Sequence, residues 1–92
     1  MITYIMFGKY SKLALDKISS NRTKTAVSQI NELGGEVKAM YALMGEYDLM
    51  FITNFPDMAH ALQASVLLSR TLGIHFSSHQ AVTVEEFDSL MV

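Results

Sequence analysis

The chain has no cysteine among its 92 residues, which excludes disulfide bridges, zinc–thiolate sites and cysteine nucleophiles. It also lacks a long hydrophobic run. Its longer apolar stretches, such as residues 40–44, fall far short of the roughly 20 residues that a membrane span needs. The first residues show neither the basic start nor the small-residue cleavage site of a signal peptide. These absences favour a cytoplasmic protein without a membrane partner.

The chain has no excess of positive charge either, because it contains seven basic and nine acidic residues and its net charge is −2. Nucleic-acid-binding domains usually carry a basic excess on one face, so a nucleic acid partner is not expected. Most of the basic residues nevertheless lie early in the chain, at Lys9, Lys12, Lys17, Arg22 and Lys24. They are either ordinary solvated charges or an anion-attracting rim around a pocket.

What is present is a composition that is 50% hydrophobic, enough for the core of a single domain over residues 1–92. Residue patterns predict four strands and two main helices. The strands are expected at residues 2–8, 37–44, 47–54 and 74–82. The helices are expected from residue 20 or 21 to about 33 and from 57 to 72, with a helical turn within 11–18 and a short helix at 84–90. A two-residue hairpin loop, Gly45-Glu46, is expected between the second and third strands.

This order predicts an α+β fold, a ferredoxin-like β-α-β-β-α-β sandwich with an antiparallel four-stranded sheet and strands one and three in its centre. The inner face of the second helix is expected to comprise Met58, Ala61, Leu62, Ser65, Leu68 and Leu72. In the second strand, alternation places Val37, Tyr41 and Leu43 on one face, opposite Met40 and Met44.

Both faces of the predicted sheet are apolar, although two helices can cover only one of them. In strand one, for example, Ile5 and Phe7 point away from Tyr4 and Met6. An exposed apolar patch drawn from several strands needs a cover, and a second copy of the chain is the simplest one. The competing cover is the C-terminal helix, folded onto its own sheet through Phe87 and Leu90. We therefore expect a homodimer or a higher homo-oligomer.

Several short elements, taken in order, carry a resemblance to a known family. The Gly-x-Tyr-Asp element is Gly45-Glu46-Tyr47-Asp48, and the others are Thr3-Tyr4-Ile5 with Gly8-Lys9-Tyr10, Leu33-Gly34-Gly35, Pro56-Asp57 and Thr83-Val84-Glu85-Glu86-Phe87. On these residues the chain resembles the GYD domain family along nearly its whole length. The resemblance implies a dimeric α/β barrel, in which two ferredoxin-like sheets face each other, and implies little about activity.

Tyr47 and Asp48 allow two interpretations. As functional residues, a phenol and a carboxylate would point into a pocket and hold a ligand or move a proton. As structural residues, Asp48 would accept backbone N–H bonds at the turn while Tyr47 packs with its hydroxyl outward. The candidates for catalysis are Asp48, Tyr47 and His79.

No metal site and no cofactor are expected. His75 and His79 share a strand face, where residues four apart lie about 13 Å from each other, and no metal-binding motif includes His60. The aromatic side chains could line an apolar pocket. The candidate ligand-binding residues are Tyr4, Tyr10, Tyr41, Tyr47, Asp48, His60 and His75.

Three functions remain open from the sequence. The first is a homo-oligomeric module that binds or senses a small, partly apolar molecule. The second is a cofactor-independent oxygenase or isomerase of the dimeric α/β-barrel type, which rests on analogy of fold. The third is a purely structural assembly module.

Overall fold

The computed structural model describes all 92 residues. The elements, in chain order, are β1 (Ile2–Tyr10), α1 (Lys12–Leu15), α2 (Ser20–Glu32), β2 (Glu36–Ala42), β3 (Leu49–Phe55), α3 (Met58–Leu72), β4 (Ile74–Ala81) and α4 (Val84–Leu90). The predicted order of strands and helices is confirmed, and the helical turn expected after the first strand is α1.

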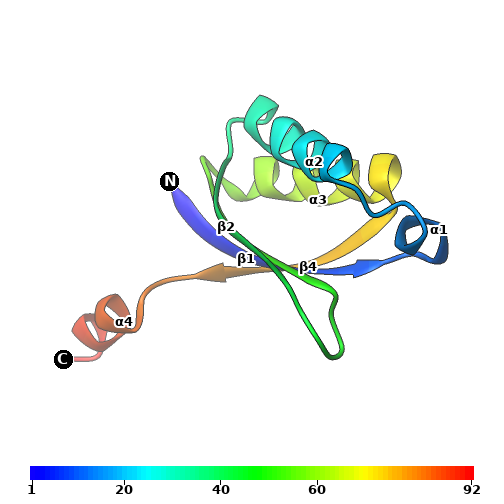
Figure 1. Cartoon of the computed structure of the whole chain (residues 1–92). Helices are drawn as coiled ribbons and strands as arrows, with labels where there is room; N and C mark the ends of the chain where they lie inside the picture. Colours follow the sequence, from blue (N-terminus) through cyan, green and yellow to red (C-terminus); the bar gives the residue numbers. More distant parts are fainter.

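The four strands form one sheet in the order β2-β3-β1-β4, and every neighbouring pair is antiparallel. The central positions of β1 and β3 are as predicted. Helices α2 and α3 both lie on one face of this sheet, as Figure 1 shows. The arrangement is the ferredoxin-like sandwich that the sequence predicts. We call the other face of the sheet the open face.

Side chains at the helix starts explain where the helices begin. Ser19, Asp57 and Thr83 each accept a hydrogen bond from a backbone N–H of the first turn of α2, α3 and α4, respectively. Such caps satisfy N–H groups that have no partner within the helix. Helix α3 ends at Gly73, whose φ of 69° lies in the left-handed region that glycine adopts without strain.

The core lies between the two helices and the sheet. Its sheet side consists of buried side chains from β1 and β3, and its helix side consists largely of alanines with two larger residues. The members are Tyr4, Met6, Phe51, Phe55, Ala26, Ile30, Ala61, Ala64 and Leu68. The prediction that Met58 and Leu62 face the core is wrong, since they are 66% and 60% exposed. The small side chains of α3 face the sheet instead and permit a close approach of the helix.

Strand β2 contains an irregularity that changes which residues face the core. Val37 lies opposite Thr53, but Ala39 lies opposite Ile52, so β2 has one extra residue at this point. Such a bulge reverses the alternation of the side chains that follow it. Val37 and Met40 therefore both pack against the core. The prediction that Val37 and Met40 lie on opposite faces is wrong for this reason.

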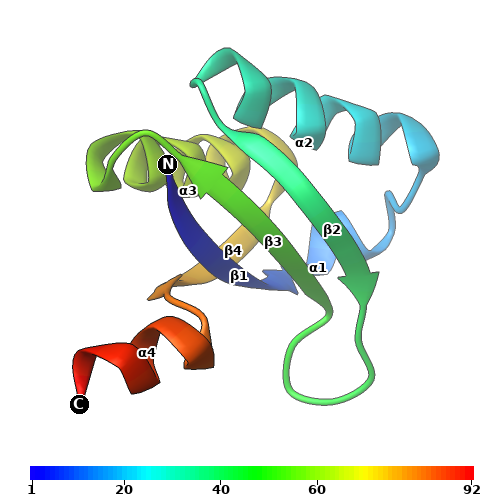
Figure 2. The ribbon, with the colours of Figure 1, turned by 90° about the vertical axis from the view of Figure 1, so that its left-hand side faces the viewer.

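The connection between β2 and β3 is also longer than predicted. It covers residues 43–48 rather than two residues, and Figure 2 shows it extending beyond the sheet. The backbone N–H of Leu43 donates to the carbonyl oxygen of Asp48 at 2.8 Å. Tyr47, predicted to lie in the third strand, therefore belongs to this loop.

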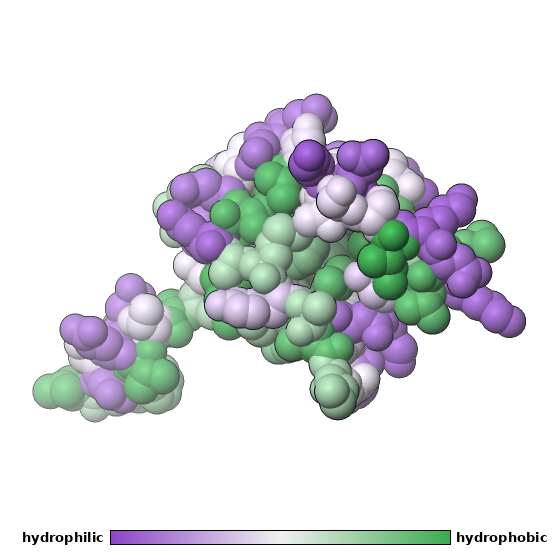
Figure 3. Space-filling model, viewed as in Figure 1, coloured by the Kyte–Doolittle hydropathy of each residue, from purple (hydrophilic) through white to green (hydrophobic).

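The open face has no cover within the chain. Helix α4 has no buried residue and projects away from the sheet (Figures 1 and 3). Its Phe87 and Leu90 are 51% and 71% exposed, so the competing cover, this helix folded over its own sheet, is not what the structure has. None of the helices combines the length and hydropathy that crossing a bilayer requires.

Candidate functional site

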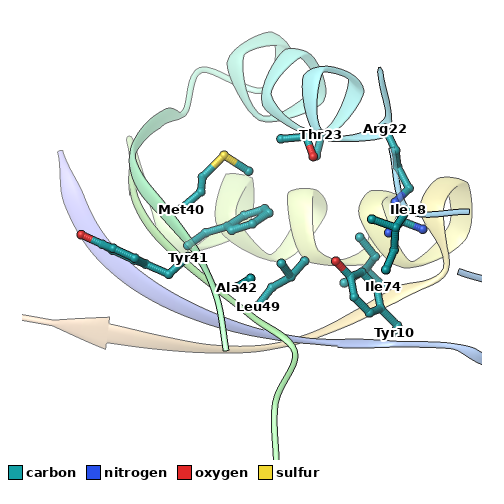
Figure 4. Close-up of a pocket in the computed structure, with 11 residues that line it drawn as sticks. Tyr10, Ile18, Arg22, Thr23, Met40, Tyr41, Ala42, Leu49 and Ile74 are labelled. Atoms are coloured by element: carbon teal, nitrogen blue, oxygen red, sulfur yellow. The ribbon is translucent and has the colours of Figure 1, made fainter. Parts of the chain in front are cut away.

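A hollow of about 280 Å³ lies on the helix side of the sheet, below the start of α2. We call it the α2 cavity. Nine of its eleven lining residues are hydrophobic. The lining comprises Tyr10, Ile18, Arg22, Thr23, Ala26, Met40, Tyr41, Ala42, Leu49, Phe51 and Ile74. Figure 4 labels most of them, and they come from α2, from the segment before it and from all four strands.

Arg22 is the one charged residue of this lining. Its guanidinium lies over the ring of Tyr10, 4.7 Å from the ring centre, and one of its terminal nitrogens donates to the carbonyl oxygen of Ala14. The ion pairs of the structure are Lys38 with Glu36 and His60 with Asp57. Arg22 therefore has no carboxylate partner. Of the five basic residues in the early part of the chain, only Arg22 borders the cavity.

The Gly-x-Tyr-Asp loop fastens β3 to the end of β1. One carboxylate oxygen of Asp48 accepts the backbone N–H of Tyr10 at 2.9 Å. The backbone N–H of Asp48 donates to the carbonyl oxygen of Gly8, also at 2.9 Å. This geometry agrees with the structural interpretation of Asp48, although the bonds run to β1 rather than to its own turn. It also holds Tyr10 and the following Leu49 in place, and both line the cavity.

Tyr47 and His79, two other catalytic candidates, each lie next to Phe7 on the open face. The ring of Phe7 lies 5.3 Å from the ring of Tyr47 and 5.8 Å from that of His79. The Nε2 atom of His79 is 3.0 Å from the hydroxyl of Ser77. Tyr47 and His79 thus flank Phe7, whereas the Asp48 carboxylate is directed to the backbone of β1.

The remaining candidates do not line the α2 cavity. Tyr4 is buried in the core against the edge of Phe55, and its hydroxyl has no hydrogen-bond partner. The Nδ1 atom of His75 lies 3.0 Å from the Ser69 hydroxyl. His60 lies beside Asp57. The backbone N–H of His60 donates to the Asp57 carboxylate, and the His60 ring also hydrogen-bonds to it. Both bonds lower the pKa of Asp57, the backbone bond more than the ring.

Of the seven predicted ligand-binding residues, only Tyr10 and Tyr41 line the cavity. The ring of Tyr41 is directed away from the other labelled side chains in Figure 4. The sequence analysis grouped Arg22 with four other basic residues, as either solvated charges or an anion-attracting rim around a pocket, and did not single it out. A signal was present, because Arg22, Ala26 and Ile30 are spaced by four residues and so share one side of α2. Arg22 thus continues the stripe on which Ala26 and Ile30 are buried.

The GYD domain model matches residues 4–91. The chain belongs to the GYD domain family. No curated protein matches this GYD domain.

Solved structures share the fold of this GYD domain at low sequence identity. The Leucine response regulatory protein LrpA of Mycobacterium tuberculosis matches with a TM-score of 0.59 and 10% identity, over 89% of this chain and 51% of LrpA. The hypothetical protein PHS023 of Pyrococcus horikoshii matches with a TM-score of 0.57 and 18% identity, over 90% of this chain and 92% of that protein. The GYD domain thus spans about half the length of LrpA. At these identities the likeness concerns the fold alone.

Proposed function

We propose that this GYD domain is a homo-oligomeric module that binds a small, partly apolar molecule in the α2 cavity. The observation that carries the proposal is the cavity itself, an apolar hollow of about 280 Å³ with Arg22 and Thr23 in its lining. Binding sites for small molecules combine apolar walls with a few polar groups in this way. A cavity of roughly 150 Å³ can hold benzene, so the α2 cavity suits a ligand about twice that size.

The hollow is open to solvent, and its lining rather than its size marks it out, since nine of its eleven residues are hydrophobic. The likeness to LrpA gives further support. By its name that protein is a leucine response regulator, so the same fold occurs in a protein associated with a response to a small apolar amino acid.

Homo-oligomerisation is the second part of the proposal. The opposed central residues Ile5 and Ile52 lie on the open face with Phe7 and Met50, and α4 leaves this face uncovered (Figure 1). Two copies of the same apolar face are complementary under two-fold symmetry. A specific interface buries roughly 800 Å² per partner, an area that a four-stranded sheet can provide.

An enzymatic function is a second candidate, because Tyr47 and His79 flank Phe7 on the open face. A second sheet placed over this face would enclose the phenol and the imidazole, which can exchange protons with a substrate. Turnover of phenolic or carbonyl compounds without an added cofactor, lost in His79→Gln but retained in His75→Gln, would support a cofactor-independent oxygenase or isomerase.

The binding function can be tested with neutral probes, 4-methylpentan-1-ol and 2-phenylethanol, added to the isotope-labelled protein. We expect saturable NMR shifts of the amides of Thr23 and Leu49, which border the cavity. Ala42→Phe, which adds a ring at the cavity wall, should remove these shifts. Ala59→Phe makes the same change at an exposed position of α3 and should retain them. Shifts that persist in Ala42→Phe would contradict binding in this cavity.

A further inference from the structure

Arg22 is a half-buried cation without a counter-ion in an otherwise apolar lining. A charge removed from water is costly unless another group compensates it. The Tyr10 ring and the Ala14 carbonyl oxygen provide only part of that compensation. We infer that the α2 cavity binds small apolar monocarboxylates, with the guanidinium of Arg22 recognising the carboxylate. This inference rests on the proposed binding function and names the class of ligand.

The donors that such a ligand needs are free. A guanidinium has five N–H donors in a planar fork that matches the two oxygens of a carboxylate. The side chain of Arg22 makes a single hydrogen bond within the protein, to Ala14. Its remaining donors are therefore available to an anion.

The position of the guanidinium is set before any ligand arrives. Ala14 holds one terminal nitrogen, and the Tyr10 ring lies against the guanidinium. In Figure 4 the side chain descends from the start of α2 towards Tyr10 and Ile18, at one end of the lining. A group held in its bound geometry loses little conformational entropy when the ligand binds.

The rest of the lining disfavours ligands that carry an ammonium group. It contains no aspartate or glutamate, so the ammonium group of an amine or an amino acid would find no charged partner. Met40, Leu49 and Ile74 offer only apolar contact to the body of the ligand. The lining therefore favours an apolar acid over the corresponding amino acid, because burying an unpaired ammonium is unfavourable.

Three molecules of similar shape separate these possibilities: 4-methylpentanoate, 4-methylpentan-1-ol and leucine, which is 4-methylpentanoate with an added α-ammonium group. Their dissociation constants would be measured by NMR titration of the wild-type protein at pH 7 and low salt. We expect 4-methylpentanoate to bind about tenfold more tightly than the alcohol, the usual effect of a charge-assisted hydrogen bond. Leucine should bind more weakly than 4-methylpentanoate.

Variants then assign the preference to Arg22. Arg22→Gln should bring the acid and the alcohol to similar affinity, while Arg22→Lys keeps part of the difference. Lys24→Gln removes an exposed charge from the same helix, outside the cavity lining, and should behave as the wild type. A preference for the acid that persists in folded Arg22→Gln would overturn the inference.

The wild-type titrations decide the matter even if Arg22→Gln does not fold. If the alcohol or leucine binds as tightly as the acid, the inference is overturned while the proposed binding function stands. If none of the three molecules shifts the amides around the cavity, both are overturned.

Discussion

The carboxylate of Asp48 accepts the backbone N–H of Tyr10 at 2.9 Å, across 38 positions of sequence. This bond fastens the loop after β2 to the last residue of β1. Tyr10 in turn supports the guanidinium of Arg22 with its ring. The aspartate of the Gly-x-Tyr-Asp element is thus connected to the α2 cavity through the position of Tyr10, without lining the cavity itself.

Replacing Asp48 by alanine should lower the free energy of unfolding by about 2 kcal/mol, the usual contribution of a hydrogen bond to a charged group. Asp48→Asn retains an acceptor oxygen and should lose less. Urea unfolding followed by circular dichroism measures both. Glu46→Ala removes an exposed carboxylate from the same loop and should leave stability unchanged. Unaltered stability of Asp48→Ala would contradict the structural role.

Tyr4→Phe should raise the free energy of unfolding by about 1 kcal/mol, because the buried hydroxyl of Tyr4 has no hydrogen-bond partner and its burial is unfavourable. Tyr41→Phe is the matched control, since Tyr41 is exposed and its hydroxyl remains in water. The two variants would be compared with the wild type by urea unfolding. A loss of stability in Tyr4→Phe would show that this hydroxyl has a partner in solution.

The Asp57 carboxylate at the start of α3 should make stability depend on pH. Hydrogen bonds from the backbone and ring of His60 lower the pKa of Asp57 in the folded protein. The stabilisation by the carboxylate is therefore present above the pKa of the unfolded chain and disappears as the pH falls through the lower pKa of the folded state. Asp57→Asn keeps a good helix cap but removes this charge.

The measurement for Asp57 is the melting temperature of the wild type and Asp57→Asn between neutral and strongly acidic pH. We expect the wild type to melt higher at neutral pH and the difference to vanish on acidification. Asp88→Asn, at an exposed position of α4, is the control for a charge change elsewhere. A difference that grows on acidification would mean that the folded protein raises the pKa of Asp57 instead of lowering it.

Ile52→Lys should convert the proposed dimer into a monomer with unchanged secondary structure. Ile52 lies opposite Ile5 in the centre of the sheet, and a lysine there would place two like charges inside a two-fold interface. Sedimentation equilibrium reports the mass, and circular dichroism the fold. Leu62→Lys, on the exposed side of α3, is the control. A dimer of undiminished affinity in Ile52→Lys would place the interface elsewhere.

The order of the elements was predictable because its signals are local. Hydrophobic periodicity marks α2 and α3, and Gly34 and Gly73 end them in left-handed conformations. The errors arose where a distant residue decides the local structure. Gly45-Glu46 has the composition of a two-residue hairpin loop, but the connection covers residues 43–48, and its Asp48 N–H bonds to Gly8 of β1.

Residue faces were predictable in the regular elements and not at the irregular one. A strict alternation describes β1, where Tyr4, Met6 and Gly8 are all buried. It fails in β2, where the extra residue between Val37 and Ala39 reverses the side chains. The α2 cavity was not predictable as a whole, because its walls come from all four strands, from α2 and from the segment before α2.

The sequence by itself determined the family, the order of strands and helices, and the two apolar faces of the sheet. Short-range periodicity, capping residues and glycines carry that information. Only the tertiary structure decided that α4 leaves the open face uncovered, that Asp48 binds the backbone of β1, and that Arg22 lines an apolar hollow without a carboxylate partner. These features depend on contacts between parts of the chain that are distant in sequence, and no local pattern of residue spacing specifies those contacts.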